Sequence, residues 1–145
     1  MNYKITSWLK VATGFQFLTA AFHSISLVFA PQGQNATEKQ LLDLMHYYEM
    51  DMGAGIHRSM WQIYSAMSSC FVLLFLLGAL INLYIVRNKT SADWAKAIVS
   101  IEIVIYGICF LVMLFLTFIP PAVLTGLVFV CLMVSYFRVR KTHSL

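Results

Sequence analysis

Long apolar runs alternate with short polar stretches along this chain, and four of the runs are long enough to cross a membrane. They cover approximately residues 7–30, 60–86, 94–118 and 120–137. At about 1.5 Å per residue, a helix of about 20 residues spans a hydrocarbon core of roughly 30 Å. The first run is also longer than the roughly 7–15 apolar residues of a secretory signal, so we expect it to be a membrane helix rather than a cleaved signal peptide. The pattern therefore predicts an antiparallel bundle of four transmembrane helices, with one longer loop at 31–59.

Apolar residues recur at helical spacing in the longer loop, and this pattern predicts a short amphipathic helix. Thr37-x-x-Gln40 has the form of a capping box, in which each side chain satisfies a free backbone donor of the other residue. We expect a helix over 37–52 that lies on the membrane surface or caps the bundle, ended by Gly53 and Gly55. Its apolar residues recur at helical spacing: Leu41, Leu44, Met45, Tyr48 and Met52.

The composition supports an all-α integral membrane protein with a single domain over residues 1–145. The chain is 60% hydrophobic and 11% charged, whereas soluble domains are roughly 45–50% apolar and about 25% charged. The formal charge of +4 does not indicate a nucleic-acid partner, because the basic residues lie at the ends of the apolar runs. Cys70, Cys109 and Cys131 each lie singly inside such a run, so no disulfide framework is expected.

The distribution of Lys and Arg predicts the orientation. Eight of these residues lie at the N-terminus, in the turn at 87–96 and at the C-terminus, and two lie in the loop at 31–60. Positive charge accumulates on the cytoplasmic side of membrane proteins. Both termini are therefore expected in the cytoplasm and the long loop outside. The eight are Lys4, Lys10, Arg87, Lys89, Lys96, Arg138, Arg140 and Lys141.

The first and third membrane helices share a short pattern. Trp8-x-Lys10 is followed by Gln16 at the same spacing at which Trp94-x-Lys96 is followed by Glu102. Both helices are predicted to run in the same direction. A parallel duplication of helix pairs explains the match. Interfacial tryptophans and lysines at the inner ends of helices explain it equally well.

Glu102 is the only acidic residue well inside a membrane run. It lies about 12 Å from the inner end of its helix at 1.5 Å per residue. A charge there costs roughly 2.5–3.5 kcal/mol on insertion scales, so Glu102 should face the bundle and be protonated or paired. Gln16 and Asn82 lie at similar depth and are its expected hydrogen-bond partners. Glu102 is either a proton-coupled or ligand-binding carboxyl group, or a polar clamp between helices.

A second group of polar residues is predicted nearer the outer face. His23 of the first helix lies at the depth of Ser65, Ser68 and Ser69 of the second helix and of Tyr106 of the third. These side chains can line a polar pocket that opens outward. The alternative is a membrane histidine that is hydrogen-bonded to a serine.

The outer loop holds a possible metal site. His46-x-x-Glu49 would place an imidazole and a carboxylate one helical turn apart, and His57 follows in the same loop. Zinc and other divalent ions take such ligands. The same side chains are also ordinary on a solvated loop, so both interpretations stay open.

Arg58 and Trp61 lie where the outer loop returns to the membrane. Arg58 can bind a lipid phosphate or pair with carboxylates of the loop, and Trp61 suits the membrane interface, as does Tyr64. Anchoring at the interface alone accounts for all three residues.

The first two helices and the outer loop share a set of features: Gly14, His23, Met52-Gly53 and Arg58-Ser59-x-Trp61-x-x-Tyr64. Together with four spans in a chain of 145 residues, these features resemble a family of small uncharacterised bacterial membrane proteins, similar in broad layout to DoxX-like proteins. The resemblance implies a location in the bacterial inner membrane, and it transfers no catalytic residue.

The sequence favours non-enzymatic binding of an apolar ligand, of lipid or quinone type, or of a partner membrane protein or a second copy of the chain. One alternative is a membrane enzyme or metal site that uses His46, Glu49 and His57 of the outer loop together with His23. The other is a proton-coupled transporter that uses Glu102. No particular cofactor is indicated. The expected ligand-binding residues are His23, Gln16, Glu102, Asn82, Ser65, Tyr106, Arg58 and Trp61.

Overall fold

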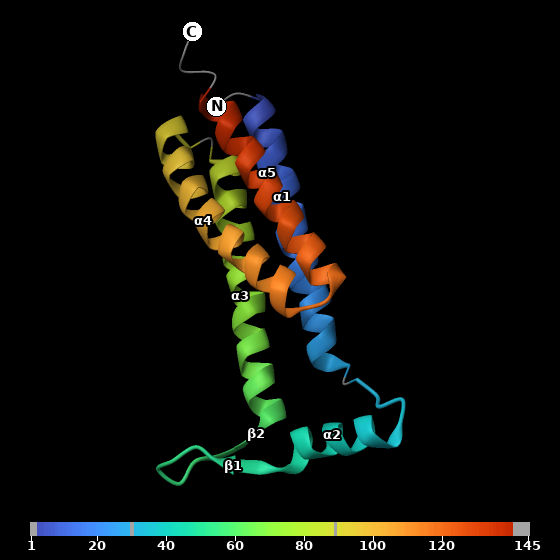
Figure 1. Cartoon of the computed structure of the whole chain (residues 1–145). Helices are drawn as coiled ribbons and strands as arrows, with labels where there is room; N and C mark the ends of the chain where they lie inside the picture. Colours follow the sequence, from blue (N-terminus) through green and yellow to red (C-terminus); the bar gives the residue numbers. More distant parts are fainter. Residues whose placement is uncertain (1–2, 30, 89, 141–145) are drawn as a thin grey trace. The chain divides into compact units, whose positions relative to one another are not determined.

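The computed structural model describes residues 3–29, 31–88 and 90–140, and over these ranges the chain forms five helices and two short strands (Figure 1). Four of the helices are long and apolar enough to cross a membrane, which confirms an all-α membrane protein. In chain order the elements are α1 (Tyr3–Val28), α2 (Ala36–Tyr47), β1 (Glu49–Asp51), β2 (His57–Ser59), α3 (Met60–Arg87), α4 (Ala92–Leu116) and α5 (Ile119–Arg140).

The long helices begin and end within a few residues of the predicted bounds, because the length of each apolar run sets the length of its helix. The predicted hairpin of the last two helices is also confirmed, since only Thr117 and Phe118 separate α4 from α5. Pro120 and Pro121 fall in the first turn of α5, where a backbone N–H has no helical partner in any case. The chain therefore reverses without losing a helical hydrogen bond.

The chain divides into two compact units. The first unit contains the residues up to Ala20 and those from Leu74 onward, and thus part of α1, the end of α3, and all of α4 and α5. Buried positions on each of these helices recur every three or four residues, as in Ala95, Val99, Glu102 and Tyr106 of α4. The first unit is thus a helical bundle with one narrow buried stripe per helix.

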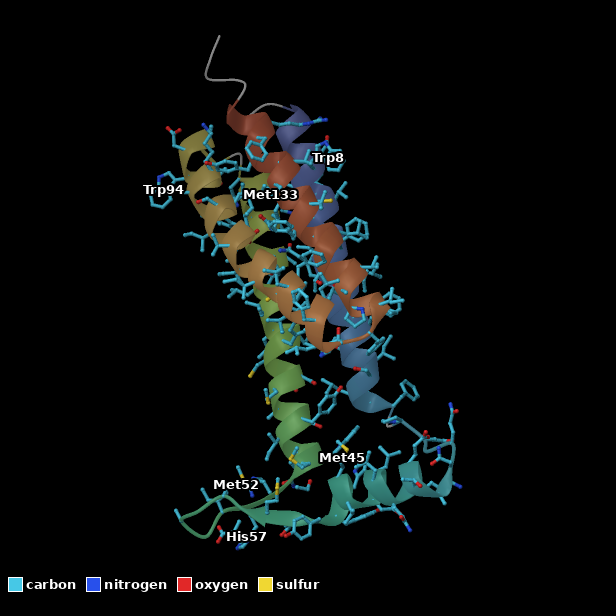
Figure 2. The ribbon with its side chains drawn as sticks, viewed as in Figure 1. Trp8, Met45, Met52, His57, Trp94 and Met133 are labelled. Carbon is cyan, nitrogen blue, oxygen red and sulfur yellow. The ribbon has the colours of Figure 1, made fainter. Side chains whose placement is uncertain are left out.

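The outer surfaces of the first unit are strongly apolar. Large side chains of α4, among them Ile101, Val104 and Phe115, are more than half exposed. Trp94, which is 68% exposed, extends away from the other helices of the unit (Figure 2). An apolar surface of this kind suits lipid tails, with the tryptophan at the membrane interface.

The α4–α5 hairpin is held by two reciprocal contacts between a glycine and a phenylalanine. A Cβ atom added at Gly107 would lie 3.0 Å from the ring of Phe129, and one added at Gly126 would lie 3.0 Å from the ring of Phe110. The two rings themselves stack, with centroids 6.3 Å apart and an angle of 11° between their planes. Small residues allow membrane helices to approach closely. Each glycine here makes room for a ring of the facing helix.

The second unit comprises residues 21–73 and contains α2, the two strands and the beginning of α3. The helix α2 is capped two residues earlier than predicted. Asn35 Oδ1 accepts a hydrogen bond of 2.9 Å from the Glu38 N–H, and Glu38 Oε2 accepts one of 2.7 Å from the Gln34 N–H. The expected box at Thr37 and Gln40 is therefore wrong, since the asparagine and glutamate upstream satisfy the free donors first.

The helix α2 is also shorter than the predicted range of 37–52, because it ends at Tyr47 and a β-hairpin follows. Gly53, Ala54 and Gly55 all have positive φ angles, of 88°, 54° and 76°. They form the tight turn that pairs Glu49 with Ser59, Met50 with Arg58 and Asp51 with His57. Asp51 Oδ1 supports the turn by accepting a 2.8 Å hydrogen bond from the Gly53 N–H.

A second capping box, which the sequence analysis missed, starts α3. Gln62 Oε1 accepts a 3.2 Å hydrogen bond from the Ser59 N–H, and Ser59 Oγ accepts one of 3.3 Å from the Gln62 N–H. Ser59-x-x-Gln62 directly precedes the longest apolar run, and this is the usual sequence signature of a helix start. The box fixes where the loop ends and the membrane helix begins.

Candidate ligand-binding site between α3 and α4

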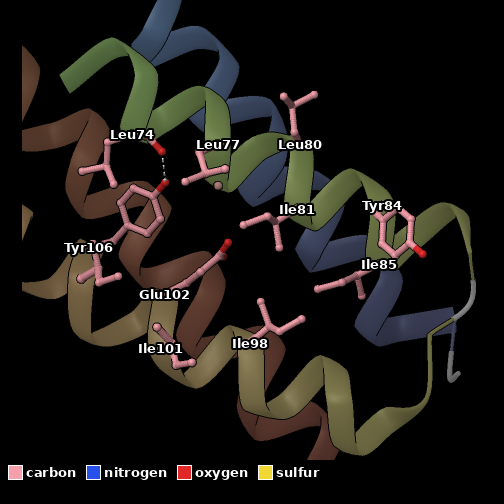
Figure 3. Close-up of a pocket in the computed structure, with 12 residues that line it drawn as sticks. Leu74, Leu77, Leu80, Ile81, Tyr84, Ile85, Ile98, Ile101, Glu102 and Tyr106 are labelled. Atoms are coloured by element: carbon pink, nitrogen blue, oxygen red, sulfur yellow. Dashed lines mark hydrogen bonds between the residues drawn. The ribbon is translucent and has the colours of Figure 1, made fainter. Parts of the chain in front are cut away.

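A cavity of about 600 Å³ lies between α3 and α4 of the first unit (Figure 3). Its volume falls within the range of roughly 300–1,000 Å³ that is usual for small-molecule sites. Most of its wall is aliphatic, and no Lys, Arg or His contributes to it. The lining residues are Leu74, Leu77, Gly78, Leu80, Ile81, Tyr84 and Ile85 of α3, and Ile98, Ile101, Glu102, Ile105 and Tyr106 of α4.

Several lining side chains are also part of the outer surface. Leu77, Leu80, Tyr84 and Ile101 are each more than half exposed. Because α3 and α4 are long and apolar enough to span a membrane, side chains at this position face lipid tails rather than water. The cavity is thus accessible to a molecule dissolved in the bilayer.

Glu102 provides the carboxyl group of the cavity wall. It belongs to the buried stripe of α4 and is only 6% exposed. Its side chain extends from α4 toward α3, between Ile81 and Tyr106 (Figure 3). The sequence placed Glu102 inside the bundle because of the cost of exposing it to lipid, and the structure confirms that position.

A hydrogen-bonded cluster joins Glu102 to α1 and α3. Asn82 Nδ2 donates to Glu102 Oε2 at 2.7 Å and to Gln16 Oε1 at 3.1 Å. Gln16 and Asn82 are both 0% exposed. The predicted contact among these three residues is confirmed, with Asn82 as the bridge between the other two.

The cluster is only partly satisfied. Within the described residues, Gln16 Nε2, Asn82 Oδ1 and Glu102 Oε1 are buried and have no hydrogen-bond partner. A buried polar atom without a partner costs about 1–3 kcal/mol. Of these three residues, only Glu102 also lines the cavity. Glu102 Oε1 is thus a buried atom without a partner that belongs to a residue of the cavity wall.

The same two residues that the short sequence pattern aligns meet at this bridge. Gln16 follows Trp8-x-Lys10 as Glu102 follows Trp94-x-Lys96, and both accept a hydrogen bond from the one Asn82 amide group. Their oxygens thus accept from the same Asn82 nitrogen. The duplication itself stays a prediction.

Tyr106 and Gly78 define the end of the cavity nearest Leu74. The Tyr106 hydroxyl donates to the Leu74 carbonyl at 3.1 Å (Figure 3), and its ring meets Phe75 edge-on with centroids 5.0 Å apart. A Cβ atom added at Gly78 would collide with the Tyr106 hydroxyl and would lie 2.7 Å from Gln16 Nε2. Sequence reasoning missed Gly78, although a lone glycine inside a membrane helix is a signal of close approach.

In the second unit, the polar residues predicted at the outer end of the helices make mainly local contacts. The His23 ring packs against Phe71, with centroids 4.8 Å apart, and the Ser26 hydroxyl bonds to the His23 carbonyl. Ser69 donates to the Ser65 carbonyl one turn earlier. Tyr106, the remaining member of the predicted pocket, belongs to the first unit. A pocket shared by His23, Ser65 and Tyr106 therefore stays a prediction.

The candidate metal ligands are not brought together. Over the described ranges, no group of three or more His, Cys, Asp or Glu side chains has an arrangement that could hold a metal ion. The His46 ring stacks on Trp61, with centroids 4.3 Å apart. Glu49 lies in β1 opposite Ser59 rather than on a helix below His46, and His57 pairs with Asp51. Arg58 Nη1 donates to the His57 carbonyl at 2.7 Å.

The chain matches no protein-family model, no curated protein and no solved structure. A fold alone would not define an activity in any case, because function depends on the geometry and chemistry of a site. The cavity between α3 and α4 combines ligand-sized space with a carboxyl oxygen that has no partner among the described residues.

Proposed function

We propose that this membrane protein binds an apolar molecule, of lipid or quinone type, in the cavity between α3 and α4, without catalysing a reaction. The observation that carries the proposal is the cavity of about 600 Å³ with an aliphatic wall and a buried carboxyl group. An apolar pocket with a few polar groups is the usual form of a small-molecule site. Glu102 would orient the ligand, and the Leu and Ile side chains would supply most of the contact area.

The accessible side of the cavity supports a ligand that arrives from the bilayer. Its rim consists of exposed Leu, Ile and Tyr side chains on two spanning helices. A molecule with a long apolar tail is concentrated in the membrane and can keep that tail among lipids while its polar end enters the cavity. A water-soluble ligand would have to cross the hydrocarbon layer first.

The location of the protein is part of the proposal. The bacterial inner membrane and the DoxX-like layout are inferred from the resemblance of the first two helices and the outer loop. The cytoplasmic position of both termini is inferred from the eight Lys and Arg residues near the ends of the chain and in the turn at 87–96, against two in the outer loop.

The test is native mass spectrometry of the full chain after gentle release from detergent, with a matched pair of variants. Ile101 lines the cavity, whereas Ile108, two turns further along α4, does not. The two side chains are 60% and 58% exposed. Ile101→Trp fills the cavity with a large ring, and Ile108→Trp places the same ring on a surface outside it.

A discrete apolar adduct that is kept by the wild type and by Ile108→Trp, and lost by Ile101→Trp, is the expected result. Equal retention in all three proteins, or no adduct in any of them, would refute the proposal. Metal analysis of the same samples adds an independent check. Stoichiometric metal that disappears in His46→Ala would move the functional site to the outer loop.

A further inference from the structure

The groups around Glu102 indicate whether its carboxyl group is ionised or neutral when it meets a ligand. Its hydrogen-bond partner is the neutral amide of Asn82, and the cavity wall contains no basic side chain. An ionised carboxylate in a membrane helix needs a cation, water or several donors, and an unpaired one costs roughly 2.5–3.5 kcal/mol on insertion scales. One amide donor does not offset that cost. The neutral acid is the form that suits this site.

The hydrogen bond from Asn82 also fixes which oxygen carries the proton. Asn82 Nδ2 is a donor, so Glu102 Oε2 must accept and acts as the carbonyl oxygen of the acid. The hydroxyl is then at Oε1, the buried oxygen that has no partner among the described residues. The hydroxyl of a protonated carboxyl group donates a hydrogen bond, so a ligand that meets it must supply an acceptor. The buried part of the cavity wall therefore offers the Glu102 O–H group to an acceptor, while the Tyr84 hydroxyl lies on the exposed rim.

The depth of Glu102 restricts the acceptor further. Glu102 follows the interfacial Trp94 by eight positions, which is about 12 Å along the helix at 1.5 Å per residue. A hydrocarbon core is roughly 30 Å thick, so this position lies well inside it. The ester groups of phospholipids stay close to their hydrated headgroups. A neutral lipid without a charged headgroup can bring a carbonyl group to this depth.

We propose that the cavity selects neutral lipids that carry a carbonyl group, such as quinones, and that the Glu102 hydroxyl donates a hydrogen bond to that carbonyl oxygen. This inference rests on the proposed function and specifies its ligand. Glu102 acts as a specificity-determining residue, since an alkyl chain without an acceptor leaves its hydroxyl unsatisfied.

The test uses the full chain in nanodiscs of dialkyl ether lipids, which contain no carbonyl group that competes. The probes are decylbenzoquinone, decylbenzene and a diacyl phosphatidylglycerol, and the bound fraction of each is measured by native mass spectrometry. One net hydrogen bond corresponds to about three- to tenfold in affinity. Decylbenzoquinone should therefore bind about three- to tenfold more tightly than decylbenzene, which has the same tail.

Two substitutions test whether Glu102 acts as a neutral hydrogen-bond donor rather than as a charged group. Glu102→Gln keeps a carbonyl oxygen for Asn82 and replaces the hydroxyl with an N–H donor, so the preference for the quinone should persist. Glu102→Met has a similar length and no donor, so the preference should disappear. Loss of the preference in both variants, with retained helicity and thermal stability, would refute a neutral donor.

An infrared spectrum of the wild type tests the same point without any substitution. The carbonyl band of a protonated carboxylic acid should be present, should be absent from Glu102→Gln, and should shift on addition of decylbenzoquinone but not of decylbenzene. Absence of that band from the wild type would overturn the inference.

The remaining outcomes separate this inference from the function on which it rests. Equal binding of decylbenzoquinone and decylbenzene, blocked by Ile101→Trp, would refute selection by Glu102 and leave a general apolar site. Tighter binding of diacyl phosphatidylglycerol than of the quinone would refute the neutral-lipid class. Binding of no probe to the cavity would refute the proposed function itself.

Discussion

The two units of this protein use polar residues in opposite ways. In the second unit they are frequent and mostly exposed, and they bond to near neighbours in sequence. Asp51 accepts from Gly53, and Arg58 donates to His57. In the first unit, Gln16, Asn82 and Glu102 come from three different helices, are almost fully buried and leave three polar atoms without partners among the described residues.

The difference shows that a high density of polar residues in a sequence does not by itself locate a site. On a loop, water and local turns satisfy polar groups at little cost. Inside a membrane bundle a buried Thr can bond to the preceding turn of its own helix. The side chains of Gln16, Asn82 and Glu102 instead bond between helices, and each unsatisfied atom lowers stability. An isolated Gln, Asn or Glu in an apolar run is therefore the stronger indication of a functional position.

The largest expected effect comes from removal of the bridge in the first unit. Asn82→Leu leaves Gln16 Oε1 and Glu102 Oε2 without their donor and should lower the free energy of unfolding by about 2–6 kcal/mol, at roughly 1–3 kcal/mol per unsatisfied atom. The measurement is reversible unfolding in mixed micelles with increasing SDS.

The matched control removes the whole cluster. The triple variant Gln16→Met, Asn82→Leu and Glu102→Met has no unpaired polar atom at these three positions, and apolar replacement of a buried polar group of similar volume is often neutral or stabilising. It should be more stable than Asn82→Leu alone. A triple variant less stable than the single one would show that the cluster is a net source of stability and would weaken the contrast between the units.

The next effect concerns Gly78, where Tyr106 and Gln16 both approach α3. Gly78→Ala places a methyl group against the Tyr106 hydroxyl and should cost about 1–3 kcal/mol through overpacking. Gly14→Ala is the control, because a Cβ atom at Gly14 meets nothing within 4 Å. The control should be neutral or stabilising by up to about 1 kcal/mol through helix propensity. Equal effects in SDS unfolding would refute the close packing at Gly78.

A smaller effect is expected at the start of α2 in the second unit. Asn35→Ala removes the side-chain cap and should destabilise the helix by about 1 kcal/mol. Thr37→Ala, at the position that the sequence pattern favoured, should change little. Hydrogen exchange of the α2 amides measures both variants. Faster exchange in Thr37→Ala than in Asn35→Ala would contradict the observed cap.

The smallest effect is expected at His46 and His57, the histidines of the outer loop that the sequence offered as metal ligands. His46→Ala removes the ring that stacks on Trp61 and should cost about 0.5–1 kcal/mol, the usual contribution of an aromatic pair. His57→Ala, in the exposed strand β2, should have almost no effect. Tryptophan fluorescence and thermal unfolding report both. A large loss of stability in His57→Ala would show that His57 makes stabilising contacts beyond its own hairpin.

The long helices and the Gln16–Asn82–Glu102 contact could be predicted from the sequence, for physical reasons. The length of an apolar run fixes a membrane helix, and the cost of burying polar groups in lipid forces residues at the same depth to meet. Neither inference requires knowledge of how the helices pack.

The cap of α2, the hairpin and the cavity could not be predicted, because the sequence allows several local structures at these positions. Two capping motifs overlap around residues 35–40, and Asn35 with Glu38 forms the one that is used. Gly53-Ala54-Gly55 was expected to end a helix, but it closes a hairpin in which both strands are only three residues long. The cavity depends on which faces of α3 and α4 meet, so Gly78 and Ile101 could not be assigned to it in advance.

The reciprocal glycine and phenylalanine contacts of the α4–α5 hairpin also bear on how the protein reaches its membrane. The connection is two residues long, and the Thr117 hydroxyl is already bonded to the Met113 carbonyl at 2.7 Å. Such a turn exposes few unsatisfied groups to lipid. The two helices can therefore insert together as one preassembled hairpin.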